Sequence, residues 1–122
     1  MALKAAHLQQ GQRAEQQACN YLMQQGLKLV TRNYRSPYGE IDLIMQDKNA
    51  LVFVEVRYRK NIKHGLPEET VTYPKQRRLR ATAEHYLQQT IKHGDIACRF
   101  DIVAYSGHLD DHHVNWIQNA LI

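Results

Sequence analysis

The sequence predicts an α/β fold in which a mixed central sheet is flanked by helices. Two long segments have apolar residues at helical spacing, and short segments rich in β-branched and aromatic residues lie between and after them. The order is helix, three strands, helix, and then one or two strands. Because short turns separate the first three strands, we expect them to form an antiparallel meander, which the strand after the second helix can join.

Each expected element has a boundary signal. The first helix is expected over residues 5–25, where Gly26 supplies a C-terminal stop. The second is expected over residues 74–94, because Pro74 fits the first helical position and Gly94 ends the pattern. A turn is expected at 36–39 and a loop at 59–73. The strands are expected over residues 27–34, 40–46, 51–58, 99–105 and 114–117, the last two joined by a turn near Ser106-Gly107 or near Asp110-Asp111.

Composition indicates one domain over residues 1–122. Hydrophobic residues make up 43% of the chain and charged residues 23%, which is usual for a globular protein. No stretch approaches the roughly 20 apolar residues of a membrane span, and the first ten residues lack the apolar segment of a signal peptide. We therefore expect a cytoplasmic protein with no membrane partner, in which Cys19 and Cys98 are buried, reduced thiols.

Two of the expected strands carry acidic residues that strand pairing would bring together. If Asp47 pairs with Ala50 across a short turn, the same register places Asp42 opposite Glu55. Regular alternation then places two acids of the first strand on the same face as one acid and one arginine of the second. The residues on that face are Glu40, Asp42, Glu55 and Arg57.

Opposed carboxylates lie about 5 Å apart at Cβ and repel each other. Asp42 and Glu55 therefore need a compensating group, which can be a shared proton, a neighbouring arginine or lysine, or a divalent cation. A divalent cation such as Mg²⁺ or Mn²⁺ is one candidate, because such ions take carboxylate oxygens and can activate water at a phosphodiester. Glu15 falls on the apolar face of the first helix and can reach the same point. Arg57 can bind a phosphate. The alternative is a structural ion pair between Arg57 and one of the acids.

Short blocks spread over the chain form a recognisable set. They are Gly11-x-x-x-Glu15, Gly26, Arg32-Asn33-Tyr34, Gly39-Glu40-Ile41-Asp42-Leu43-Ile44, Val52-Phe53-Val54-Glu55-Val56-Arg57 and Arg99-Phe100-Asp101-Ile102-Val103. Together they resemble the YraN-like family of bacterial proteins over nearly the whole chain. That family looks like a branch of the PD-(D/E)xK nuclease superfamily, similar in fold to archaeal Holliday-junction resolvases. The resemblance implies a restriction-endonuclease-like fold.

The resemblance also implies roles for four residues. Asp42 takes the position of the metal-binding aspartate, Glu55 that of the second acid, and Glu15 that of the glutamate on the helix. Arg57 stands where the nuclease motif has its lysine. Arginine keeps the positive charge but cannot give up a proton. The implied activity is a nuclease that uses Mg²⁺ or Mn²⁺ and acts on DNA, branched or otherwise structured DNA included.

Basic residues indicate where nucleic acid would bind. The formal net charge is +4, and cations crowd the start of the second helix, where a phosphate would be favourable. A solvated basic face is the alternative. Tyrosines 34, 38, 58 and 73 lie near the basic segments and are candidates either for stacking on bases or for ordinary packing. The expected nucleic-acid contacts are Arg57, Arg59, Lys75, Arg77 and Arg78.

Three functions fit the sequence. The first is a metal-dependent nuclease, the second a nucleic-acid-binding module that keeps the nuclease fold without turnover, and the third a protein–protein adaptor. The acids Asp42, Glu55 and Glu15 favour the first, and Arg57 in place of lysine favours the second. A domain that acts on a symmetric junction is also expected to form a homodimer, although no interface pattern appears in the sequence.

Overall fold

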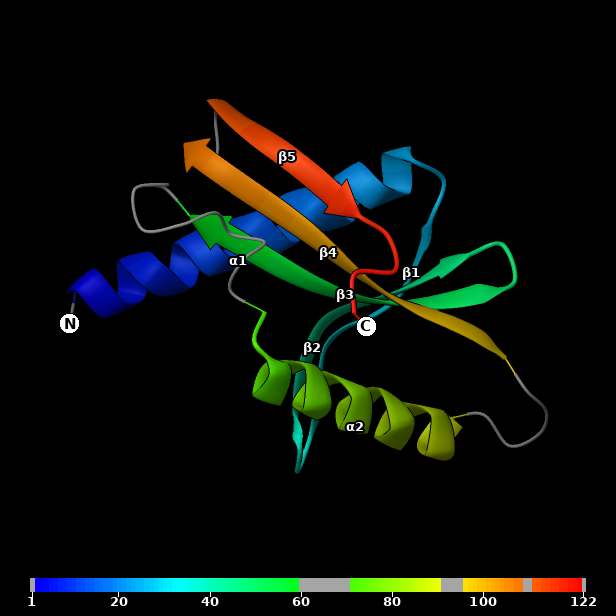
Figure 1. Ribbon diagram of the computed structural model, residues 1–122. Helices are drawn as coiled ribbons and strands as arrows, with labels where there is room; N and C mark the ends of the chain where they lie inside the picture. The colour runs from blue at the N-terminus through cyan, green and yellow to red at the C-terminus, as the bar shows by residue number, and fades with distance from the viewer. Residues whose placement is uncertain (1, 60–70, 91–95, 109–110, 122) are drawn as a thin grey trace.

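The computed structural model describes residues 2–59, 71–90, 96–108 and 111–121. The elements follow the predicted order, and the described boundaries lie within a few residues of those expected (Figure 1). The expected end of the second helix at Gly94 and most of the expected loop lie outside the described residues. The elements are α1 (Ala2–Gln24), β1 (Lys28–Ser36), β2 (Gly39–Asp47), β3 (Ala50–Arg59), α2 (Tyr73–Thr90), β4 (Ala97–His108) and β5 (Asp111–Ile117).

The five strands form one mixed sheet in the order β1-β2-β3-β4-β5. The first three are an antiparallel meander, β4 joins β3 in parallel, and β5 returns antiparallel to β4. A parallel neighbour requires a crossover, and α2 lies in that connection. The predicted α/β fold with a mixed sheet is confirmed, and it is compatible with a restriction-endonuclease-like fold. Ser106 and Gly107 pair within the β4–β5 ladder, so the turn is not at the first of the two expected positions.

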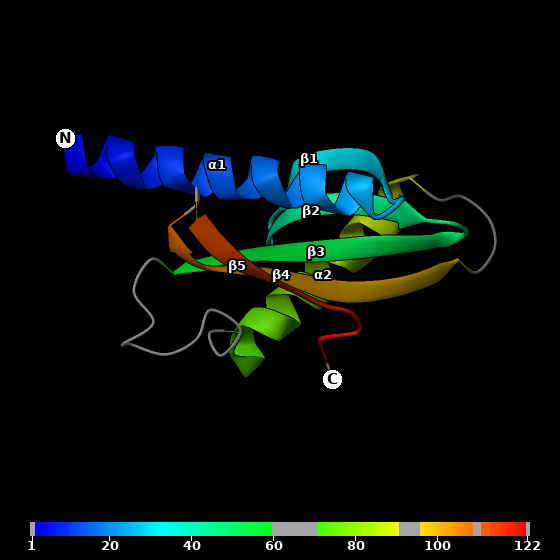
Figure 2. The same ribbon diagram turned by 90° about the horizontal axis from the view of Figure 1, so that it is seen from above.

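The two helices cover opposite faces of the sheet (Figure 2). Side chains alternate along β3, so Val52 and Val54 join the core beneath α1, while Leu51 and Phe53 join the core beneath α2. Burial on both faces explains why β3 carries an almost continuous apolar run. The acidic and basic residues near the end of this run therefore lie between two packed layers.

Backbone hydrogen bonds around Gly26 close the C-terminal end of α1, as expected. Leu27 N–H donates to the Leu22 carbonyl and Gly26 N–H donates to the Met23 carbonyl, each over 3.0 Å. Gly26 has a φ of 100°, which glycine adopts without the penalty that a Cβ would bring. Leu22 and Leu27 pack in the same core. This ending returns the chain directly into β1 and fixes α1 against the sheet.

Asp101 of β4 is a buried carboxylate whose partners are structural. Arg99 Nε donates to both of its oxygens over 3.1 Å, and Trp116 Nε1 donates to one over 2.9 Å. The backbone N–H of Asn119 donates to the other over 3.1 Å. Because these donors occupy both oxygens, Asp101 ties β5 and the segment after it to β4.

One expectation about the cysteines is wrong. Cys19 is buried in the core under α1, but Cys98 is exposed. It lies at the start of β4, before the buried stretch at residues 101–105. As for membranes, no helix in the described part of the chain is both long and apolar enough to cross one.

Candidate active site

Asp42 lies where the pairing of β2 with β3 ends. The predicted pairing of Asp47 with Ala50 is confirmed, and the ladder runs in that register as far as Leu43 opposite Val54. At the next position the Asp42 carboxylate accepts a hydrogen bond from the Val56 backbone N–H over 2.8 Å. Asp42 also lines two hollows, one on each side of the sheet. An α1-side hollow of about 310 Å³ also contains Glu15 and Glu55. An α2-side hollow of about 280 Å³ also contains Glu40, Lys75 and Arg78.

The regular alternation predicted along β2 is wrong at Asp42. Ile41 and Ile44 both pack on the α2 side, although residues three apart in a regular strand face opposite ways. Asn33 of β1, which lies level with Asp42 in the ladder, has a φ of 51°. The two strands thus share an irregularity here. Its consequence is that Asp42 points into the opening between β2 and β3, so the four predicted side chains do not share one regular face.

Three carboxylates gather around this opening. Glu15 of α1 and Glu40 and Asp42 of β2 each offer an oxygen, and these oxygens lie within 4.8 Å of one another. We call these residues the carboxylate trio. The structure therefore brings Glu15 to Asp42. Glu55 lies outside the trio and lines the α1-side hollow together with Glu15 and Asp42.

Glu40 was not selected as a site residue from the sequence. It was placed opposite Arg57 on the hairpin, but its ion pair is with Arg35 of β1, over 3.2 Å. This ion pair is weak, because the Arg35 side chain is 79% exposed and solvent screens the contact. Its position two residues before Asp42 in one strand was the signal that could have identified it.

Burial and like charges disfavour ionisation of Asp42 and Glu15, two members of the trio. Burial raises the pKa of Asp42 to about 8, and the negative charge of Glu55 contributes in the same direction. The hydrogen bond from Val56 opposes this shift. The pKa of Glu15 is also raised, first by burial and then by the charge of Glu40. At neutral pH Asp42 therefore favours a bound proton or a bound cation over a free negative charge.

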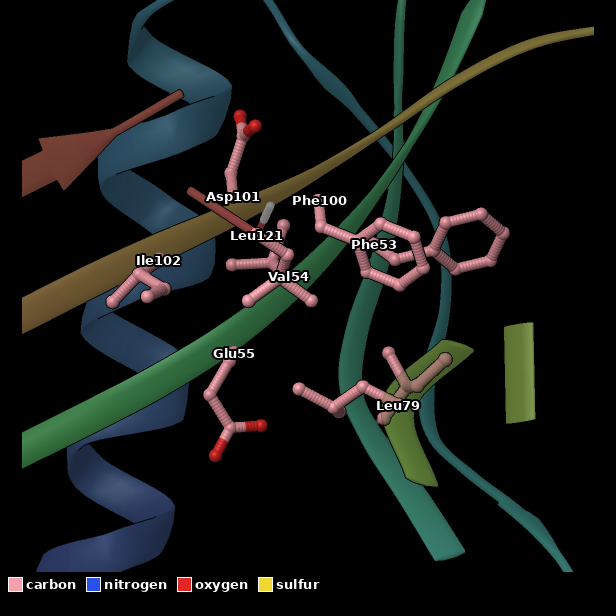
Figure 3. A pocket seen from close by; sticks show the side chains of 9 residues that line it. Phe53, Val54, Glu55, Leu79, Phe100, Asp101, Ile102 and Leu121 are labelled. Atoms are coloured by element: carbon pink, nitrogen blue, oxygen red, sulfur yellow. The ribbon is translucent and has the colours of Figure 1, made fainter. Parts of the chain in front are cut away.

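Glu55 lies between two cations. Its Oε1 is 3.3 Å from Arg57 Nε and 3.4 Å from Lys75 Nζ of α2, and its side chain is only 7% exposed. Figure 3 shows the side chain leaving β3 next to Leu79 of α2, on the other face of the sheet from Asp101. The ion pair between Arg57 and an acid, which was the structural alternative, is thus present. Lys75 adds a second cation that strand pairing could not have located.

The residues expected to contact nucleic acid lie around this site. Arg57 and Arg59 are half-buried at the end of β3. Lys75, Arg77 and Arg78 lie in the first two turns of α2. Lys75 and Arg78 line the α2-side hollow, so positive charge stands beside the trio. A negatively charged ligand entering this hollow would meet both cations and acids, which is the arrangement required when a cation and a phosphate share a site.

Comparison with known proteins identifies the family. The model of the uncharacterised protein family UPF0102 matches residues 14–105. A UPF0102 protein of Nitrosococcus oceani is 45% identical over 116 residues, which cover 95% of this chain and 94% of the relative. A UPF0102 protein of Coxiella burnetii is 50% identical over 111 residues (91% and 90%), and one of Francisella tularensis is 44% identical over 111 residues (90% and 92%). The chain belongs to the UPF0102 family, which is the YraN-like family that its sequence blocks resemble.

Proposed function

We propose that this UPF0102 protein is a metal-dependent nuclease that hydrolyses phosphodiester bonds in DNA, branched or otherwise structured DNA included. The observation that carries the proposal is the carboxylate trio, in which oxygens from α1 and β2 lie within 4.8 Å of one another. Residues far apart in sequence converge there at an energetic cost, since the pKa of Asp42 is raised to about 8. A cation would offset that cost.

The trio fits a hard divalent cation. All three ligands are carboxylate oxygens, which Mg²⁺ and Mn²⁺ prefer. Glu15, Glu40 and Asp42 would hold the ion, since each offers an oxygen within 4.8 Å of the other two. A bound ion would supply activated water and neutralise charge at the phosphate. Glu55 lines the α1-side hollow with Glu15 and Asp42, and its negative charge would attract the ion from there.

The cations of the site would position the phosphate. Lys75 and Arg78 line the α2-side hollow with Asp42, so a phosphate there would lie between them and the trio. Arg57 holds its charge at Glu55 but cannot release a proton. Lys75 carries an amine, which unlike a guanidinium can exchange a proton with a substrate, and its Nζ is 3.4 Å from a Glu55 carboxylate oxygen. Lys75 therefore supplies the proton-transfer chemistry that is lost where arginine replaces the motif lysine.

A calorimetric titration with Mn²⁺ tests the site. We expect wild-type protein to bind Mn²⁺ and the double variant Asp42→Asn/Glu55→Gln not to bind it. Glu84→Gln is the matched control, because Glu84 is an exposed carboxylate on α2 outside the trio. Cleavage of branched, duplex and single-stranded DNA with Mg²⁺ or Mn²⁺ should then follow the same pattern. Folded wild-type protein that binds no metal, with or without DNA, would refute the proposal.

Arg57 in place of lysine favours one competing function, a nucleic-acid-binding module without turnover. That function predicts DNA binding with no cleavage in either metal. A protein–protein adaptor predicts neither DNA binding nor metal binding. The homodimer, the cytoplasmic location and the single domain over residues 1–122 stay predictions.

A further inference from the structure

A third hollow adjoins the proposed active site. It has a volume of about 340 Å³ and lies between the turn that joins β1 to β2 and the N-terminal half of α2. Tyr38 lines it from the turn, and Arg77 and Arg78 line it from the helix. Arg78 also lines the α2-side hollow beside Asp42 and Lys75. The two hollows therefore have one lining residue, Arg78, in common.

Hydrogen bonds fasten the turn to α2. Ser36 Oγ donates to Thr82 Oγ1 over 3.1 Å, and Thr82 Oγ1 donates to the Arg78 carbonyl over 2.8 Å. The Tyr38 backbone N–H donates to Ser36 Oγ over 3.0 Å. Gly39 has a φ of 154°, and a Cβ there would meet Thr82 Oγ1 at 3.4 Å. The position of Tyr38 relative to Arg78 is thus set by the fold and not by a chance side-chain contact.

The groups around this hollow are those that bind a nucleotide. The side chain of Tyr38 is an exposed aromatic residue, with 56% of its surface accessible. Arg77 and Arg78 are exposed, and among the residues that the structure describes no carboxylate lies within 4.0 Å of either guanidinium. Guanidinium groups bind phosphate, and tyrosine rings stack on bases of any sequence.

The other tyrosines near the basic segments are arranged differently. The Tyr34 hydroxyl shares a hydrogen bond of 2.6 Å with His85 Nδ1, and its ring packs against Tyr86. Tyr58 lines the α1-side hollow. Tyr73 is exposed, but Arg77 lies over its ring at 6.0 Å and the ring does not line the third hollow. Of these four tyrosines, Tyr38 alone combines exposure with a place in that hollow.

We propose that this hollow holds a nucleotide whose base is unpaired and stacks on Tyr38, with its phosphate on Arg77 and Arg78. The inference rests on the proposed nuclease function and specifies its substrate. In a continuous duplex both faces of each base are covered by neighbouring base pairs. A base that stacks on Tyr38 must therefore come from a single strand, an end or a branch point next to the phosphate that is cut.

Fluorescence anisotropy with EDTA present can test the inference without cleavage. The two probes are a labelled single-stranded 12-mer of thymidine and a 12-mer with the same backbone and abasic residues. We expect wild-type protein to bind the first at least about five-fold more tightly, which is the lower end of one base–aromatic stack. Tyr38→Ala should reduce this ratio to about one, whereas Tyr38→Phe should retain it. Tyr73→Ala, an exposed tyrosine outside the hollow, should also retain it.

Arg78→Gln provides a second variant with a different expected result. It should weaken binding of both probes equally. It should also make the slope of log affinity against log salt concentration shallower by about one, which corresponds to one lost phosphate contact. The inference is overturned if wild-type protein binds the two probes with equal affinity, or if Tyr38→Ala leaves the affinity ratio unchanged. In either case, cleavage of DNA by wild-type protein would leave the proposed nuclease function in place. Wild-type protein that binds neither probe nor any other DNA overturns both.

Discussion

Replacing Asp42 with asparagine should stabilise the metal-free protein, and by more as the pH rises. In the folded state the pKa of Asp42 is raised to about 8, whereas its ordinary value is 3.8. Between these values the folded protein holds a proton that the unfolded chain has released. Stability is therefore fully present below the ordinary pKa and falls as the pH rises towards 8. Asparagine has no proton to lose, and its side-chain oxygen can still accept the hydrogen bond from Val56.

The magnitude follows from one linked proton. The unfolding free energy of wild-type protein should fall by about 1.4 kcal/mol per pH unit relative to Asp42→Asn between pH 5 and pH 7. Between pH 5 and pH 7 the unfolding free energy of the variant should therefore rise by roughly 3 kcal/mol relative to that of the wild type. The gain levels off above pH 8, because Asp42 is then ionised in both states.

Urea unfolding with EDTA at pH 5, 6 and 7 measures this difference, since other titrating groups largely cancel between the two proteins. Asp101→Asn is the matched control. Asp101 is a buried aspartate of the same sheet whose carboxylate receives hydrogen bonds from Arg99 and Trp116. Its replacement should destabilise the protein at every pH, by about 2 kcal/mol or more. An Asp42→Asn advantage that does not grow between pH 5 and pH 7 would show that Asp42 is ionised in the fold, and the electrostatic reasoning would be wrong.

Four further predictions concern metal binding, two glycines and Lys75. Mn²⁺ should bind more tightly as the pH rises from 6 to 8, because the proton on Asp42 must leave; equal calorimetric heats in buffers of different ionisation enthalpy would contradict this. Gly26→Ala should lower the unfolding free energy by about 1 kcal/mol because of its φ of 100°. Gly11→Ala should raise it by up to about 1 kcal/mol, since a Cβ there meets nothing within 4 Å; thermal unfolding measures both. Lys75→Arg should retain DNA affinity and lose at least about ten-fold in cleavage rate, and unchanged cleavage would remove Lys75 from proton transfer.

The sequence predicts the sheet well because its signals are local. The turn between Asp47 and Ala50 sets the register of the β2–β3 hairpin, and that register is confirmed as far as Leu43 opposite Val54. Gly26 predicts the end of α1 because a left-handed residue is needed there. Each of these features depends on a few neighbouring residues.

The candidate site depends on contacts between distant residues, and there the sequence was less informative. Strand alternation cannot anticipate the irregularity at Asn33, which accompanies the turn of Asp42 into the opening between two strands. The pairing of Lys75 with Glu55 depends on how α2 packs against β3. For the same reason Glu40 was seen on the hairpin but its convergence with Glu15 was not. Periodicity locates faces, whereas convergence of side chains requires the packed layers.

Asp101 and Asp42 are two aspartates of the same sheet with very different surroundings. Asp101 is fully buried and receives donors from Arg99, Trp116 and the backbone of Asn119, so the chain itself satisfies its charge. Asp42 receives one backbone donor and faces two other carboxylates. At Asp42 the like charges are relieved at neutral pH by a bound proton, which its raised pKa of about 8 reflects. Local conflicts of this kind are expected where function, and not stability, determines the residue. The proposed divalent cation would replace that proton, because carboxylate oxygens, its preferred ligands, already lie together there.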